Sequence, residues 1–186
     1  GGAKSFHYGP FRNRAAADEF ESKCLDLFQV RHCQEDLVPS PEHAGCIYGE
    51  MNMCLRPCQM VVGVEEYRSE VGRLTEFLSS GGKSLLVTIA AARDRLSEEL
   101  NFEEAASQHK RYEKVQQVLR LRDELASDID RLNGVAVTGS VEPEAVELWF
   151  VARGVWLEPR RFPLAAPGAE IVSMDRRLRQ IVEAMD

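Results

Sequence analysis

The sequence lacks any long hydrophobic run. Hydrophobic residues make up 44% of its 186 residues, but no stretch approaches the roughly eighteen consecutive apolar residues of a membrane-spanning helix. The first thirty residues are polar and charged, which indicates no secretory signal peptide. We therefore expect no membrane partner and a cytoplasmic location.

An excess of positive charge is also lacking. The net charge is −7 and no segment is broadly cationic, so charge alone does not predict tight, sequence-independent binding of nucleic acid. There is no phosphate-binding glycine loop, and the four histidines do not pair with a nucleophile at any known motif spacing. The sequence thus predicts no enzyme active site.

Cysteine, in contrast, is concentrated in one place. Four of the five cysteines lie within 26 residues, with the spacing C-x12-C-x7-C-x3-C, at Cys33, Cys46, Cys54 and Cys58. The segment between them is rich in proline and glycine and holds little apolar material around which to fold. We therefore expect a cross-link there, and four thiolates on a metal centre would supply one.

The four thiols could form disulfides, bind zinc or hold an iron–sulfur cluster. Disulfides persist mainly in oxidising compartments. Structural zinc sites usually have short C-x(2–4)-C pairs at both ends, whereas only Cys54 and Cys58 are that close. Iron–sulfur clusters accept four irregularly spaced cysteines. Iron–sulfur, zinc and metal-free thiols all remain possible on this argument. His32 directly precedes Cys33 and could tune such a site or join it as a ligand. The simpler interpretation is that His32 is an incidental neighbour.

Cys24 stands apart from this group. It lies four residues after Phe20 and four before Phe28, on one apolar stripe of a predicted helix. Cysteine packs well as a small hydrophobe, so we expect Cys24 to be buried in the core.

Hydrophobic periodicity predicts an α+β fold that is mainly α. Helices are expected over 14–28, 64–79, 83–99, 102–132 and 173–185. Gly81 and Gly82 should end the second helix, and Asn101 should cap the fourth. The short joint at Asn101 predicts an antiparallel helical hairpin. Alternation after Gly134 predicts a β-hairpin with strands at 147–151 and 155–157. The expected divisions are a linking segment at 1–29, a four-cysteine module at 30–63, a helical region at 64–132, and a small β element with a C-terminal helix at 133–186.

Five short motifs follow one another along the chain. They read F-H-Y-G-P-F, F-x-x-R-x-C, C-x7-C-L-R-P-C, E-E-Y with a later F-L-S-S-G, and L-N-F-E-E-A-A, at Phe6–Phe11, Phe28–Cys33, Cys46–Cys58, Glu65–Gly81 and Leu100–Ala106. In this order and at these intervals, they resemble the central region of the bacterial UvrC family, the nuclease subunit of nucleotide excision repair. The first resembles the segment that closes that family's GIY-YIG nuclease domain, and the last resembles the start of its UVR motif.

The resemblance implies a cofactor and a partner. It implies a [4Fe–4S] cluster on the four cysteines, with zinc as the alternative, and a UVR helical hairpin that docks on the C-terminal UVR hairpin of UvrB. The residues it assigns to that contact are Phe102, Glu103, Ala105, Ala106 and His109. Damaged DNA would be reached through the wider complex, and both nuclease centres of the family would lie in other domains.

Two departures and two rival interpretations accompany this resemblance. His109-Lys110 follows Ser107-Gln108 where the UVR motif normally carries an Arg-Asp pair, and Val62-Gly63-Val64 replaces a more polar helix start. The first rival is a UVR-type regulatory adaptor with structural zinc, against which Gly9-Pro10-Phe11 and the β-hairpin argue. The second rival is a structural helical domain with reduced thiols. Phe102 itself has two interpretations, a docking anchor beside small alanines or an ordinary core aromatic.

Overall fold

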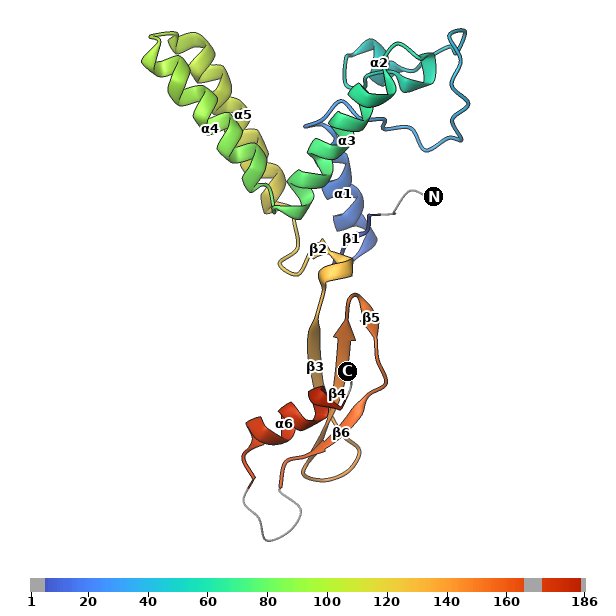
Figure 1. The fold of residues 1–186 in the computed structure, drawn as a ribbon, viewed down its shortest axis with the longest axis vertical. Helices are drawn as coiled ribbons and strands as arrows, with labels where there is room; N and C mark the ends of the chain where they lie inside the picture. The colour runs from blue at the N-terminus through green and yellow to red at the C-terminus, as the bar shows by residue number, and fades with distance from the viewer. Residues whose placement is uncertain (1–5, 166–171, 185–186) are drawn as a thin grey trace. The chain divides into compact units, whose positions relative to one another are not determined.

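The computed structural model describes residues 6–165 and 172–184 (Figure 1). The fold is α+β, as expected, and it divides into two compact units, 1–129 and 130–186. The first unit is mainly helical, and the second is a small antiparallel sheet with one helix. Within the described ranges, no helix has both the length and the apolar character needed to cross a membrane.

Four long helices build the first unit, together with a single-turn helix and a short 3₁₀ helix. They are α1 (Arg14–Leu25), α2 (Ile47–Glu50), the 3₁₀ helix η1 (Pro57–Gln59), α3 (Val64–Ser79), α4 (Lys83–Glu98) and α5 (Phe102–Arg120). The helix predicted over 64–79 is confirmed, and the one predicted over 83–99 ends one residue earlier. The N-terminus of α1 is fixed by Asn13, whose side-chain oxygen accepts the Ala16 N–H at 2.9 Å.

The glycine pair after α3 ends the helix, as predicted. Gly81 and Gly82 have φ values of 61° and 87°, a left-handed conformation that glycine adopts without strain. The Gly82 N–H donates to the Phe77 carbonyl at 2.8 Å, which is the closing hydrogen bond of a Schellman motif. A Cβ at Gly82 would lie 2.5 Å from Leu119 Cδ1, so the chain approaches α5 closely here.

The predicted helical hairpin is present, because α4 and α5 run side by side with a short connection (Figure 1). Asn101 caps α5 as predicted, since its side-chain oxygen accepts the Glu104 N–H at 3.4 Å. The length predicted for α5, from residue 102 to residue 132, is wrong. The helix ends at Arg120, and a turn leads to strand β2 (Ser127–Asp128) and the 3₁₀ helix η2 (Ile129–Arg131).

Helix α5 ends early because the residues after it pair with the N-terminal part of the chain. Strand β2 pairs antiparallel with β1 (Tyr8–Gly9), and Ile129 N–H donates to the His7 carbonyl at 3.0 Å. Asp123 accepts the Arg12 N–H at 2.7 Å. These contacts join segments more than a hundred residues apart, so helical periodicity could not reveal them.

The core of the first unit gathers side chains from α1, α3, α4, α5 and the segment after α1. Its buried members are Phe20, Cys24, Phe28, Val30, Phe77, Leu85, Ile89, Val115 and Val118. Phe28 and Phe77 meet edge to face with ring centroids 5.4 Å apart, a favoured aromatic geometry. Cys24 is 3% exposed, which confirms its predicted place in the core.

The second unit is a sheet with β4 at its centre. Strand β4 (Ala145–Ala152) pairs antiparallel with β3 (Gly134–Gly139), β5 (Val155–Trp156) and β6 (Arg160–Pro163). The predicted hairpin is confirmed: β4 and β5 are joined by Arg153 and Gly154, whose φ values of 51° and 77° suit a type I′ turn.

One helix follows the sheet in the second unit. Helix α6 (Met174–Glu183) lies within the range predicted for the last helix, whose final predicted residue is outside the described residues. The guanidinium of Arg177 lies 4.4 Å from the ring centroid of the buried Phe162. This cation–π contact links α6 to strand β6.

Candidate metal centre

The four clustered cysteines lie in a loop between α1 and α3 that contains only α2 and η1 as regular structure. All of them are free thiols; Cys54 and Cys58 are buried, and Cys33 and Cys46 are partly exposed. Cys46 immediately precedes α2, and Cys58 lies inside η1. The loop therefore contains two buried and two partly exposed cysteines.

The Cys54–Cys58 turn is shaped by backbone conformations that residues other than glycine rarely adopt. Arg56 and Met60, which flank η1, both have left-handed conformations, with φ values of 56° and 53°. This geometry turns the Arg56 N–H onto the sulfur of Cys54 at 3.4 Å. Such N–H donors stabilise a thiolate, which is the form in which cysteine binds a metal.

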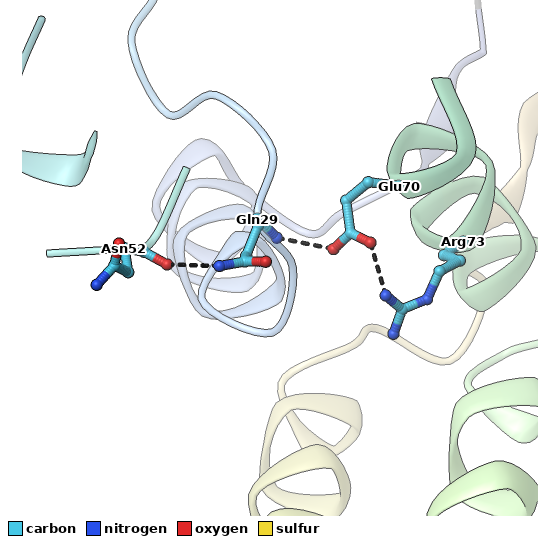
Figure 2. Close-up of polar contacts among 4 residues, drawn as sticks. All are labelled: Gln29, Asn52, Glu70 and Arg73. Atoms are coloured by element: carbon cyan, nitrogen blue, oxygen red, sulfur yellow. Dashed lines mark hydrogen bonds and ion pairs between the residues drawn. The ribbon is translucent and has the colours of Figure 1, made fainter. Parts of the chain in front are cut away.

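Helix α3 provides the platform to which this loop is attached. Glu70, on α3, is 8% exposed, and its Oε1 accepts the backbone N–H of Gln29 at 2.8 Å. The other oxygen, Oε2, pairs with Arg73 at 2.6 Å. The Gln29 side chain in turn donates to the Asn52 carbonyl at 2.9 Å, as Figure 2 shows.

Two further hydrogen bonds fix the extended segment that leads to Cys33. Tyr67 Oη, also on α3, accepts the Arg31 N–H at 3.0 Å. The Leu55 N–H donates to the Gln29 carbonyl at 3.0 Å, which ties the residue after Cys54 to the same segment. Two segments of the cysteine loop are thus held beside each other on one helix.

The electrostatics place Cys54 among the other three cysteines. Burial raises the pKa of the Cys54 thiol, the Arg56 N–H lowers it, and thiolates at Cys46, Cys58 and Cys33 raise it further. Repulsion of this kind reaches only groups that lie near one another. A bound cation would relieve it, since metals deprotonate the thiols that they bind.

The sequence analysis predicted a site at the cysteines but gave no role to Glu70 and Tyr67. A signal for Glu70 was available, because it lies four and seven residues before Leu74 and Phe77, on the apolar stripe of α3. A carboxylate on a buried stripe is rarely left without a partner. Its partner, the Gln29 backbone, gave no signal in the sequence.

The residues predicted to bind a partner hairpin separate into two sets. Phe102, Ala106 and His109 are exposed on α5 at helical spacings of four and three, which place them on one face. Glu103, in the first turn, is also exposed, whereas Ala105 is buried. Phe102 is 63% exposed, so within this chain it is not a core aromatic.

A comparison with known families adds an independent finding. Residues 2–77 match the family model described as the UvrC/Cho excinuclease, middle domain. That span contains the whole cysteine loop and both α3 residues that hold it. The chain corresponds to the central region of the UvrC family.

Relatives in the UvrC family extend the match along the chain. "UvrABC system protein C" of Sodalis glossinidius is 30% identical over 176 residues, which cover 92% of this chain and 28% of that protein. The proteins of the same name from Lachnospira eligens and Aliivibrio fischeri are 26% and 29% identical, over 80% and 86% of this chain. The chain thus spans about 28% of the length of the first of these relatives. No solved structure gives a significant match.

The cysteine loop of this UvrC region suits a metal centre by donor type more than by present geometry. Four free thiols, a shared neighbourhood around Cys54 and an N–H aimed at its sulfur all favour thiolate ligation. Among the described residues, however, no three His, Cys, Asp or Glu side chains already converge as a metal site requires. Binding would therefore have to draw the sulfurs together, since metal ligation and folding are coupled.

Proposed function

We propose that this chain is the non-catalytic central segment of a UvrC-type nucleotide-excision-repair subunit. In this proposal the four cysteines hold a [4Fe–4S] cluster, and the α4–α5 hairpin docks on the C-terminal UVR hairpin of UvrB in the cytoplasm. Damaged DNA is reached through the wider complex. The observation that carries the proposal is the loop itself, in which Cys54 and the three other free thiols that influence its pKa belong to one loop held by α3.

The cluster is favoured over zinc by the ligand spacing and the family. Only Cys54 and Cys58 form the short pair typical of zinc sites, and the resemblance to UvrC implies iron–sulfur ligation. The cluster would cross-link a loop that holds little apolar material, and would take the place of a hydrophobic core there. A structural zinc would instead support the rival function of a UVR-type regulatory adaptor.

Anaerobic purification tests the cluster directly. We expect a brown protein with broad absorbance near 400 nm and about four iron atoms per chain, as for thiolate-bound clusters. Serine at any one of the four loop cysteines should reduce the iron content, whereas Cys24→Ser should not, because Cys24 is buried in the core. Stoichiometric zinc without iron would rule out the cluster.

The hairpin tip is the surface that we assign to UvrB. Leu100 in the connection is 73% exposed, and Phe102 follows it at the start of α5. Exposed Ala106, one turn further along, is small enough to let a second helix approach closely. An aromatic anchor beside small residues is a common helix-docking arrangement.

A single substitution tests this assignment. Phe102→Ala should weaken binding to the UvrB hairpin by about 2 kcal/mol or more, as a hot-spot residue would, which is about 30-fold in Kd. The melting temperature should change little, because Phe102 is exposed. Val87→Ala is the matched control, since Val87 is a similarly exposed apolar residue near the opposite end of α4. Unchanged affinity in folded Phe102→Ala would remove this residue from the interface.

The proposal also assigns no catalysis to the segment. The sequence offers no clustered carboxylates in a metal-binding arrangement and no GIY-YIG core. The purified chain should therefore leave a damaged duplex intact in the presence of Mg²⁺ or Mn²⁺. Metal-dependent incision by this chain alone would contradict the assignment.

A further inference from the structure

His32 carries a buried nitrogen with no evident role in the fold. Its Nε2 is shielded from solvent and has no hydrogen-bond partner within the described residues. Buried polar atoms in native proteins are nearly always paired, and an exception generally serves a ligand, an ion or a water molecule. The ring itself is well held, because it stacks on Tyr48 with centroids 4.5 Å apart and an interplanar angle of 14°.

The two stacked residues lie close in the sequence to two of the cysteines. His32 immediately precedes Cys33, and Tyr48 lies in α2, two residues after Cys46. The Tyr48 carbonyl also accepts the Met53 N–H at 2.9 Å, directly before Cys54. The imidazole therefore stacks on a residue whose own segment carries Cys46 and is hydrogen-bonded to the residue before Cys54, while His32 itself adjoins Cys33.

We propose that His32 donates a hydrogen bond from Nε2–H to a sulfur atom of the cluster. This inference rests on the proposed function, in which the four cysteines hold that cluster. Donors to cluster sulfurs withdraw electron density and stabilise the more negative, reduced state, so they raise the reduction potential. His32 is thus a positioning residue that tunes the cluster and shields it, rather than one of its ligands.

His43 shows what a purely structural histidine looks like in the same loop. Its Nδ1 accepts the Gly45 N–H at 3.0 Å, and its carbonyl accepts a hydrogen bond from the Gln59 side chain at 3.0 Å. These contacts shape a turn and account for the residue locally. His43→Gln is therefore a control for replacing a histidine of the loop.

Two substitutions at His32 separate the N–H from the aromatic ring. His32→Phe keeps a ring for Tyr48 but has no donor, and His32→Gln keeps an N–H donor but has no ring. The whole chain, loaded anaerobically, is compared by iron content, by rate of iron loss to a chelator and by midpoint potential from an EPR-monitored redox titration. The midpoint potential reports only on molecules that hold a cluster, so incomplete loading does not obscure it.

The donor role predicts a specific pattern. His32→Phe should shift the midpoint potential to a lower value and lose iron about tenfold faster or more, the usual effect of removing an outer-shell partner. His32→Gln and His43→Gln should stay close to the unsubstituted chain. Circular dichroism at 222 nm should be the same for all variants.

Other results would overturn the inference. An unchanged midpoint potential and iron-loss rate in His32→Phe would exclude the donor, and so would equally accelerated iron loss in both His32 variants. Accelerated iron loss in His32→Gln alone would assign the residue to packing on Tyr48. Nitrogen hyperfine coupling typical of a directly bound imidazole would make His32 a ligand instead. Absence of iron from the unsubstituted chain would refute the proposed function itself, which is a distinct result.

Discussion

Replacing Glu70 with alanine is expected to destabilise the first unit by about 2 kcal/mol. The buried carboxylate accepts the Gln29 N–H at 2.8 Å and pairs with Arg73 at 2.6 Å. A hydrogen bond to a charged group contributes about 1.5–3 kcal/mol, and an ion pair with a half-exposed arginine adds about 0.2–1 kcal/mol. Because Gln29 is an exposed residue, water can partly replace the lost acceptor, so we expect a value in the lower part of this range.

Two further variants sharpen the measurement. Glu70→Gln keeps an oxygen for the Gln29 N–H and loses only the charge, so it should cost about 1 kcal/mol, nearer the value of a neutral hydrogen bond. Glu65→Ala is the matched control: Glu65 pairs with Arg68 across the same i, i+3 spacing of α3, but both side chains are exposed. Its cost should stay below about 1 kcal/mol.

Urea unfolding followed by circular dichroism at 222 nm provides the free energies, since the long helices α1, α3, α4 and α5 belong to the first unit. Tryptophan fluorescence is unsuitable, because Trp149 and Trp156 both lie in the second unit. The m-value should be unchanged if only stability is affected. If Glu70→Ala is no more destabilising than Glu65→Ala, then Glu70 does not anchor the cysteine loop.

Two other predictions concern the core and the helix junction. Burial, with a smaller effect of Glu21, raises the pKa of Cys24 to about 12. Only about one Cys24 thiol in ten thousand is then ionised at pH 8, so iodoacetamide should label Cys24 only in denaturant or as the pH rises toward 12; labelling at the rate of the loop cysteines would contradict this. Gly82→Ala should destabilise the chain, because its Cβ would lie 2.5 Å from Leu119 Cδ1 at a φ of 87°, whereas Gly72→Ala, with open space inside α3, should stabilise it by about 0.5–1 kcal/mol. Thermal melts of both glycine variants test the contrast, and a stabilised Gly82→Ala would refute it.

The boundaries that could be predicted from the sequence are those set by local chemistry. Gly81 and Gly82 stop a helix because glycine adopts a left-handed backbone conformation without strain, and Asn101 starts one because its side chain pairs with an N–H three residues later. The Arg153-Gly154 turn fixes a hairpin for a similar reason. Each of these signals acts within a few residues, so no tertiary contact was needed to read it.

The end of α5 could not be predicted in this way. Leu125 and Ile129 continue the helical spacing, yet Leu125 is exposed and Ile129 follows a strand. That strand exists because Tyr8 and Gly9 pair with it. The free energy of a long-range pairing outweighs a weak helical preference, and the periodicity carries no trace of the competing partner.

For the cysteine loop, too, some features follow from the sequence and others only from the tertiary structure. Its spacing and composition, by themselves, marked Cys33, Cys46, Cys54 and Cys58 as the chemical centre of the chain, because thiols so concentrated in a segment with little apolar material call for a cross-link. Only the tertiary structure decided what holds them. Glu70 and Tyr67 reach the loop from a helix that begins after the last cysteine, and His32, next to Cys33, has a buried nitrogen with no hydrogen-bond partner among the described residues. The chemical type of a ligand atom is a property of the residue itself. The burial of a side chain and its hydrogen-bond partners depend on which distant segments pack together.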